Sequence, residues 1–460
     1  MRDITGQPKV VTIAPPIQIF HPVFQEFLDR INDPKFEPDE EVTAQVVRLM
    51  SHSSQIYHLE ASALSELLDG YLGQAISGKS RNSDGIIFRN EDHRNIPLIL
   101  FEYTRGVGEG GCDPSIQATF SLREFLIKPE VRAFRILCAF TPRIYDGPQL
   151  SDLLDECGCP SFILAGGGPN LSILGAFHND KYIVQPLTTI YMGEASTYEN
   201  THAHHIAKVF TSLRRARDTL DQHYERISEQ ATTQTNPKNP RELGRRCFFP
   251  YPTKFKEYQA GAGTEPQLTE FEYTDVPDAH PTNVTFFAQV KLSKRKLVVK
   301  FVDRYGVEAH ELLAKEGMAP QLLYCGTLDG RNDVRNGGIH AQGRMSFGLY
   351  VGPLRMVVMD YVEAQKRDDW PANAREQTKE AIKKLHDGGF VFGDLRPPNV
   401  LFSGGRVFLI DFDWAGKEGE ARYPHGLSRN VNWPEDSVSL EMKGILPEHD
   451  FFMLNQLFSE

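Results

Sequence analysis

Two spacings of apolar residues occur along the chain, and they predict where helices and strands lie. Apolar residues at helical spacing predict helices over 39–79, 205–227, 306–316 and 374–389. Short apolar runs with β-branched content, separated by Gly, Pro and Asn, predict strands at 85–88, 97–103, 134–140, 160–168, 171–177, 181–188, 284–290, 296–302 and 355–361. Helices and strands alternate, so the pattern predicts an α/β first half and an α+β second half.

The domain boundaries follow from shifts in composition. Residues 1–38 are Pro-rich and irregular, which predicts an arm lying on a domain. Residues 39–227 carry the elements of one α/β domain, and 269–460 carry those of a second domain. Between them, 228–268 is expected to be a linker, because its first part, 228–244, is polar and rich in Pro and Asn. A chain of 460 residues is too long for one ordinary core, which favours this division.

Composition narrows the classes of protein and of partner. A net charge of −11 argues against nucleic-acid binding through bulk charge, although a local basic face remains possible. No apolar run approaches 18 residues and the N-terminus has no apolar core, so we expect no membrane span and no secretory signal. The close pair Cys157 and Cys159 lacks zinc-knuckle spacing. Reduced thiols, and an intracellular protein of cytoplasm or nucleus, are therefore expected.

The second half contains the parts that phosphoryl transfer from ATP requires. That reaction needs a carboxylate at the acceptor, oxygen ligands for Mg²⁺ and a cation on the phosphates. The stretch "GDLRPPN" supplies Asp394 for the acceptor hydroxyl and Asn399 for a metal. "LIDFD" places Asp411 at a strand end for the metal that bridges the phosphates. Two prolines between Asp394 and Asn399 stiffen the loop and direct both side chains to one site.

This order of residues resembles the catalytic loop and metal-binding triplet of the protein-kinase-like fold. It is most similar to the aminoglycoside and choline kinase branch, whose loop often reads H-G-D-x-x-x-x-N. The resemblance implies a two-lobed domain that binds ATP and Mg²⁺ and transfers the γ-phosphate. It implies that Lys300, on the strand "KLVVKFV", binds phosphate. Glu308 on the next helix is the expected partner of Lys300, with Glu311 as the second choice.

The strand "MVVMDYV" resembles the hinge that binds adenine in that family. The resemblance implies that Met359 is the gatekeeper, and that Asp360 and Tyr361 offer backbone groups to the adenine edge. The chain departs from the family pattern at several positions. Phe392 replaces the loop histidine, and Asp413 stands where protein kinases have glycine. No glycine occurs in "DAHPTNVTFFAQV" before Lys300, and only 49 residues follow Asp411.

The first half carries a second set of acidic residues. Asp84 precedes one predicted strand, Glu102 ends the next, and Gln117 follows in a predicted helix. Asp84 and Glu102 could share one Mg²⁺ for phosphodiester hydrolysis. Over 40–200 this part resembles the restriction-endonuclease-like, PD-(D/E)xK, domain that precedes a kinase-like domain in Crinkler-type proteins of fungi and oomycetes. The family motif ends in Glu-x-Lys, whereas Thr104 stands in the lysine position here.

Three functions follow as hypotheses. The first is an ATP- and Mg²⁺-dependent kinase that phosphorylates Ser or Thr on a protein substrate, or alternatively a small-molecule acceptor. The second is a Crinkler-type nuclease that acts on DNA and carries an accessory kinase fold. The third is a catalytically weak pseudokinase scaffold. We expect Lys300, Glu308, Asp394, Asn399 and Asp411 to converge on one cleft if the first hypothesis holds.

Overall fold

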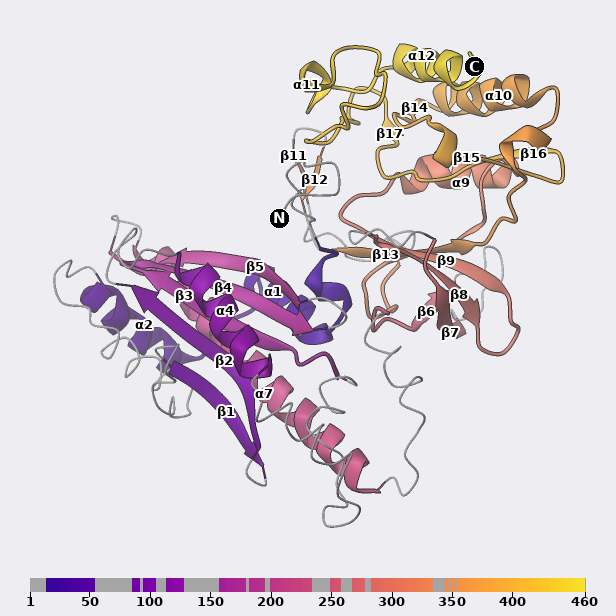
Figure 1. The fold of residues 1–460 in the computed structure, drawn as a ribbon. Coiled ribbons are helices and arrows are strands. Elements are labelled where there is room, and N and C mark those ends of the chain that lie inside the picture. Colours follow the sequence, from indigo (N-terminus) through magenta and orange to yellow (C-terminus); the bar gives the residue numbers. More distant parts are fainter. Residues whose placement is uncertain are drawn as a thin grey trace, which may run out of the picture. The chain divides into compact units, whose positions relative to one another are not determined.

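A computed structural model of the chain describes residues 14–53, 85–91, 94–104, 113–127, 157–178, 182–194, 199–233, 249–257, 267–277, 283–333, 344–346, 349–351 and 354–459. The chain has mixed α/β content and divides into two compact units, Pro16–Tyr251 and Pro252–Glu460 (Figure 1). Each unit has its own sheet. Among the described residues, no helix is both long enough and apolar enough to cross a membrane.

The N-terminal unit is built on a five-stranded sheet with the order β1-β2-β3-β4-β5. Its strands are β1 (Gly85–Glu91), β2 (Arg94–Thr104), β3 (Ser161–Gly167), β4 (Asn170–His178) and β5 (Tyr182–Tyr191). Only β2 and β3 pair in parallel, and the other neighbours are antiparallel. The helix α4 (Pro114–Ile127) lies between β2 and β3 in the chain, as a parallel pair requires. The strand predicted at 134–140 falls outside the described residues.

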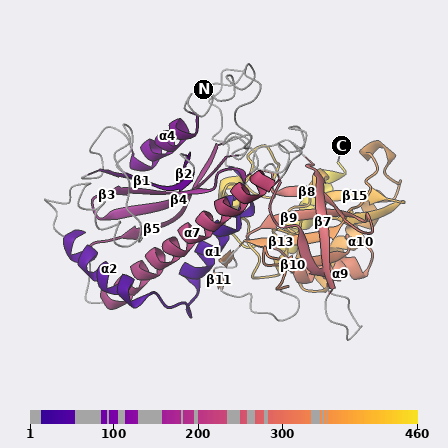
Figure 2. The same ribbon diagram turned by 90° about the horizontal axis from the view of Figure 1, so that it is seen from below.

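Helices cover both faces of this sheet (Figure 2). The helix α4 packs on one face, against β2 and β3. On the other side lie α1 (Pro22–Asn32), α2 (Glu40–Ser53) and α7 (Glu199–Thr233), and α1 and α2 both contact α7. The helix predicted over 39–79 is confirmed as far as Ser53, and the rest of that range lies outside the described residues. The helix predicted over 205–227 is confirmed and is longer than expected at both ends.

The prediction of an irregular arm over 1–38 is wrong for residues 17–32. They form the short 3₁₀ helix η1 (Ile17–Ile19) followed by α1, whose N-cap is His21. The prediction failed because the proline content of residues 1–38 was taken as a sign of irregular structure, whereas Pro22 lies in the first turn of α1, a position that proline suits. Val23, Phe24 and Phe27 on α1 are fully buried. This segment therefore contributes to the core of the N-terminal unit.

The C-terminal unit begins with an antiparallel six-stranded sheet in the order β10-β13-β9-β8-β7-β6. Its strands are β6 (Lys254–Glu257), β7 (Gln267–Asp275), β8 (Thr285–Val290), β9 (Lys296–Val302), β10 (Leu322–Gly326) and β13 (Arg355–Asp360). The two edge strands β6 and β10 contact each other, so the sheet curls nearly closed. Aromatic side chains fill the interior of this curl: Phe255, Phe271, Phe286, Phe301 and Tyr324. The predicted linker over 228–268 is thus partly structured, since it contains the end of α7 and all of β6.

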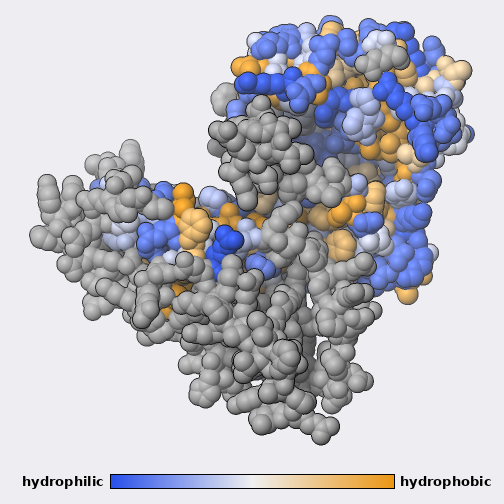
Figure 3. All heavy atoms as spheres, viewed as in Figure 1, coloured by the Kyte–Doolittle hydropathy of each residue, from blue (hydrophilic) through white to orange (hydrophobic). Residues whose placement is uncertain are grey.

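Helices and short hairpins complete the C-terminal unit. The helices are α9 (Val307–Lys315), α10 (Ala374–Asp387), α11 (Ser437–Leu440) and α12 (Pro447–Leu457), with 3₁₀ turns η4 (Arg367–Asp369) and η5 (Pro397–Asn399). The remaining strands are β11 (Arg344–Ser346), β12 (Leu349–Val351), β14 (Phe390–Val391), β15 (Val400–Ser403), β16 (Arg406–Leu409) and β17 (Gly416–Lys417). The helices predicted over 306–316 and 374–389 are confirmed as α9 and α10. The outer surface of this part is mostly hydrophilic in the view of Figure 3.

Candidate active site

A short hairpin brings Asn399 and Asp411 together. The strands β15 and β16 pair with Val400 opposite Leu409, and Ile410 N donates to Asn399 O at 3.0 Å. Two glycines, 404 and 405, form the turn, with φ of +57° and +75°. A two-residue turn with both φ positive matches the twist of a hairpin and strongly favours glycine. Because of this turn, Asn399 lies opposite Ile410, the residue directly before Asp411.

Asp394 is anchored by its own loop. Its side chain is buried, and Asn399 Nδ2 donates to both Asp394 O and Asp394 Oδ2 at 2.8 Å. The guanidinium of Arg396 donates to both carboxylate oxygens, with Nη2 at 2.7 Å from Oδ2. The Arg396 cation lies 6.0 Å from the ring centroid of Trp414 and 5.7 Å from that of Trp433. Burial raises the pKa of Asp394, and the nearby charge of Asp411 raises it further, while Arg396 opposes both.

Lys300 on β9 joins the sheet to the hairpin. Its Nζ is 2.7 Å from Asp411 Oδ1 and 2.7 Å from Asp413 Oδ2. Burial alone would lower the pKa of Lys300, but the two carboxylates outweigh it and raise that pKa. Lys300 in turn lowers the pKa of Asp411, although burial works against it. Asp411 has a left-handed backbone with φ of +66°, a conformation that is concentrated at functional sites in proteins.

The pairing expected between Lys300 and Glu308 is not the one that forms. The Glu308 carboxylate is 3.3 Å from Lys417 Nζ, and its side chain is 63% exposed. The reason is the packing of the N-terminus of α9: a Cβ on Gly306 would lie 2.4 Å from Ala415 O, and Gly306 N donates to Phe412 O. This helix end rests on the backbone that follows Asp411. The second carboxylate on Lys300 comes instead from Asp413, which the sequence pattern presented only as a departure.

The carboxyl group of Asp413 has a raised pKa. Burial and the charge of Asp411 raise the pKa of Asp413 to about 7, although Lys300 lowers it. The folded protein thus holds a proton that the unfolded chain loses near pH 4. We therefore predict that the free energy of unfolding falls by about 1 kcal/mol as pH rises from 6 to 8 because of this group. Asp413→Asn should lack this drop in urea unfolding at the two pH values. An unchanged pH dependence in the variant would contradict the prediction.

Asp450 holds the loop that carries Asp394, and the sequence analysis missed it. It lies on α12, is fully buried, and accepts hydrogen bonds from Phe392 N at 2.9 Å and Gly393 N at 2.7 Å. His386 Nε2 on α10 is 2.9 Å from the same carboxylate. The one available signal was an acid in the apolar run "DFFML", which is unusual on a buried helix face.

Phe392 takes part in an aromatic stack beneath the site. Its ring meets the Phe412 ring edge-on, with the ring centroids 5.4 Å apart. The His310 ring of α9 stacks on the same Phe412 ring, with the centroids 4.5 Å apart. His310 is itself held, with Nδ1 2.8 Å from Tyr305 Oη and Nε2 2.8 Å from Pro320 O. Phe392, which stands where the loop that this stretch resembles has a histidine, therefore acts in packing. It supports the segment between Asp411 and Asp413.

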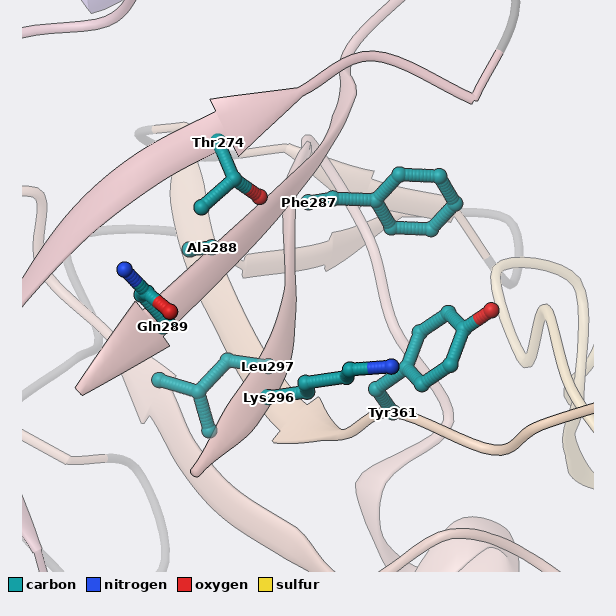
Figure 4. Close-up of a pocket in the computed structure, with 7 residues that line it drawn as sticks. All are labelled: Thr274, Phe287, Ala288, Gln289, Lys296, Leu297 and Tyr361. Carbon is teal, nitrogen blue, oxygen red and sulfur yellow. The ribbon is translucent and has the colours of Figure 1, made fainter. Parts of the chain in front are cut away.

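The predicted hinge borders a pocket of about 280 Å³ between β7, β8, β9 and Tyr361 (Figure 4). The rings of Phe287 and Tyr361 meet edge-on at 5.4 Å, and Lys296 Nζ lies 5.3 Å from the Tyr361 ring centroid. Met359 is buried on β13. Asp360 and Tyr361 are the residues expected to offer backbone groups to adenine. Their N–H groups are already engaged, since Asp360 N donates to Gln321 O and Tyr361 N donates to Lys296 O.

Glu102 and Gln117, two of the three residues predicted to form a nuclease-like site in the N-terminal unit, lie in contact. Glu102 is buried near the end of β2, and Gln117 Nε2 of α4 donates to Glu102 Oε1. The parallel pairing of β2 with β3 makes α4 cross back over the sheet, which brings Gln117 to the strand end. Thr104 ends β2 and is partly exposed. Asp84 lies outside the described residues.

Comparison with protein-family models finds no match to this chain, and comparison with curated proteins finds none.

Proposed function

We propose that the C-terminal unit is a phosphotransferase of the protein-kinase-like fold that uses ATP and Mg²⁺. One observation carries the proposal: Lys300, Asp411, Asn399 and Asp394 form one connected cluster, through the Lys300–Asp411 ion pair, the β15–β16 hairpin and the Asn399–Asp394 hydrogen bond. Cation, carboxylates and carboxamide in one place are the parts that phosphoryl transfer requires. Glu308 is not part of this cluster, and Asp413 forms the ion pair with Lys300 that was expected for Glu308.

The distance between the pocket and the cluster suits a nucleoside triphosphate. Lys296 in the pocket and Lys300 in the cluster are four residues apart on β9, which places them on one face of the sheet about 13 Å apart. A planar base fits beside the Phe287 and Tyr361 rings, and the phosphates extend along β9 to Lys300. Because the Asp360 and Tyr361 N–H groups are engaged, stacking and not hinge N–H donation would hold the base.

The donor set fits Mg²⁺. Asn399 uses its amide nitrogen on Asp394, so its carbonyl oxygen is the atom left for a metal. Asp411 has a side chain 35% exposed and supplies carboxylate oxygen, the type of ligand that Mg²⁺ prefers. The bound ion would neutralise charge on the phosphates. Lys300 would exchange its contact with Asp411 or Asp413 for a phosphate oxygen.

Asp394 is positioned to orient the acceptor hydroxyl and to accept its proton. Its raised pKa supports that role, because a base works best when its proton affinity approaches the working pH. We propose Ser or Thr of a protein as the acceptor, with a small-molecule hydroxyl as the alternative. An acceptor hydroxyl would share the Asp394 carboxylate with Arg396, which donates to both oxygens, because each carboxylate oxygen can accept more than one hydrogen bond.

The test is Mg²⁺-dependent ATP binding by calorimetry, together with transfer of label from γ-³²P-ATP to casein or to the chain itself. We predict that Asp411→Asn weakens ATP binding in Mg²⁺ at least tenfold. The variant removes the charge of Asp411, which is both a proposed metal ligand and a partner of Lys300. The exposed Asp369→Asn in η4 is the matched control and should bind as wild type does. If the wild type binds no ATP, the kinase proposal fails and the scaffold hypothesis replaces it.

The Glu102–Gln117 contact favours a second proposal, for the N-terminal unit. We propose a restriction-endonuclease-like domain with weak or absent cleavage of DNA. The strand order β1, β2, α4, β3 with β2 and β3 parallel supports that fold. The uncharged Thr104 limits activity, because one lost electrostatic contact to a reacting phosphate costs about 10²–10³ in rate.

We predict that Thr104→Lys raises Mg²⁺-dependent cleavage of plasmid DNA, measured on gels, and that adding Glu102→Ala removes the gain. Thr104→Met is the matched control, because methionine is similar in length to lysine but carries no charge. It should not raise cleavage. Efficient cleavage by the wild type, with no gain in Thr104→Lys, would mean that another cation supplies the charge. The nuclease hypothesis would then be favoured over the scaffold hypothesis.

A further inference from the structure

One polar side chain of the pocket beside the predicted hinge, Gln289 on β8, is held in a single orientation. Its Nε2 donates to Glu272 Oε1 on β7 at 2.7 Å. An ionised carboxylate only accepts hydrogen bonds, so the nitrogen of the Gln289 carboxamide, and not its oxygen, must face Glu272. Lys294 Nζ lies 3.0 Å from the same Glu272 oxygen, and its hydrogen bond lowers the pKa of Glu272. The carboxylate therefore stays ionised at neutral pH and fixes the orientation of the amide.

This orientation leaves the Gln289 Oε1 atom for a ligand. Among the residues that the structure describes, none donates a hydrogen bond to this oxygen. In Figure 4 the oxygen, and not the nitrogen, is turned toward the other residues that line the pocket. A carboxamide oxygen can accept a hydrogen bond but cannot donate one. The pocket therefore presents an acceptor that only a group carrying a hydrogen can satisfy.

The register of the sheet places Gln289 at the end of the pocket that lies away from Lys300. Gln289 on β8 pairs with Lys296 on β9, and two residues along, Phe287 pairs with Val298. Lys300 follows Val298 by two further residues on β9. Paired residues, and residues two apart on a strand, share one face of a sheet, so these side chains lie on the same face. A nucleotide with its phosphates at Lys300 and its base beside Phe287 would turn the outer edge of the base toward Gln289.

We propose that Gln289 is a specificity-determining residue, which selects adenine by accepting a hydrogen bond from its 6-amino group. The proposal rests on the ATP-binding function proposed above. In the adenine of ATP the 6-amino group is the one N–H donor of the base, so it is the group that an acceptor can bind. The N–H groups of Asp360 and Tyr361 are engaged within the protein, so recognition of the base depends on other groups. A purine with oxygen at position 6 would bring a second acceptor against Gln289 Oε1, and neither would be satisfied.

The test combines a change in the protein with a change in the ligand. Calorimetry in Mg²⁺ compares ATP with purine riboside triphosphate, which has hydrogen in place of the 6-amino group, and with inosine triphosphate, which has oxygen there. In the wild type, loss of the amino group should weaken binding about three- to tenfold, the usual contribution of one hydrogen bond, and oxygen should weaken it at least as much. In Gln289→Leu the three nucleotides should bind alike. An undiminished preference for ATP in Gln289→Leu would overturn the proposal.

A second variant tests whether Glu272 sets the orientation of Gln289. Glu272→Gln keeps the size of the side chain, but the new carboxamide can donate as well as accept, so it no longer forces the Gln289 nitrogen to face it. The preference for ATP should therefore fall toward that of Gln289→Leu. Glu270→Gln is the matched control, because Glu270 also lies on β7 and pairs with a lysine, Lys291, but does not contact Gln289. The control should keep the wild-type preference, and the same result in Glu272→Gln would overturn the orienting role of Glu272.

The wild-type measurements separate this inference from the kinase proposal. Equal affinities for ATP and the 6-hydrogen analogue would overturn the role of Gln289 and leave the proposed kinase function standing. A wild type that binds none of the three nucleotides would overturn both.

Discussion

Asp394→Asn should lower phosphate transfer by about 10²–10⁴-fold while ATP binding stays nearly unchanged, which corresponds to the usual contribution of a general base. The side chain keeps its shape, so Asn399 retains an acceptor at the same place. What disappears is the group that orients the acceptor hydroxyl and takes its proton. The ligands assigned to the metal, Asn399 and Asp411, are untouched. Calorimetry with ATP and Mg²⁺, and transfer of ³²P to casein, measure the two effects separately.

Arg396→Gln is the informative companion to this variant. Asp394→Asn removes both the proton acceptor and the ion pair with Arg396, whereas Arg396→Gln keeps the proton acceptor and removes the ion pair together with the contacts of the cation with Trp414 and Trp433. We expect the arginine variant to lose less activity. Equal losses in the two variants would show that the ion pair, and not the base, carries the effect. Full transfer activity in Asp394→Asn would mean that the role assigned to Asp394 is wrong.

Asp450→Ala should lower the free energy of unfolding of the C-terminal unit by about 3–5 kcal/mol, because several buried donors lose their acceptor together. The donors are Phe392 N, Gly393 N and the His386 ring. Asp450→Asn should cost less, since its single side-chain oxygen can still accept one of the two backbone hydrogen bonds. Because Phe392 and Gly393 directly precede Asp394, both variants should also lower phosphate transfer. Urea unfolding, followed by tryptophan fluorescence from this unit, measures the loss.

Asp436 provides the matched control. It also accepts two backbone N–H groups, from Val438 and Ser439 at the start of α11, but it is exposed. Water can replace it there, so Asp436→Ala should cost only about 0.5–2 kcal/mol, as for other helix caps. If both alanine variants cost the same, burial of Asp450 does not strengthen its hydrogen bonds and the argument for its anchoring role fails.

Local patterns in the sequence were sufficient for most individual elements and for one part of the cluster. The spacing of apolar residues located α9, α10 and most strands, because each depends on a period that is visible within about ten residues. The placement of Asn399 opposite Ile410, the residue before Asp411, also depends on a local feature, since two consecutive glycines form the turn of the hairpin. The helix α1 was missed although its signal was local. The proline content of residues 1–38 was taken to indicate irregular structure, although Pro22 occupies a position in the first turn of a helix that proline suits.

Only the tertiary structure decided which charges meet. Whether Lys300 pairs with Glu308 or Asp413 depends on the approach of Gly306 to Ala415, and these residues lie more than a hundred positions apart in the chain. Asp450 reaches its loop only through packing of α12 beside α10. By itself, the sequence determined the element types and the residues available for chemistry, because both are local properties. Partners and proton affinities depend on burial and on distances across the fold, and no local pattern contains them.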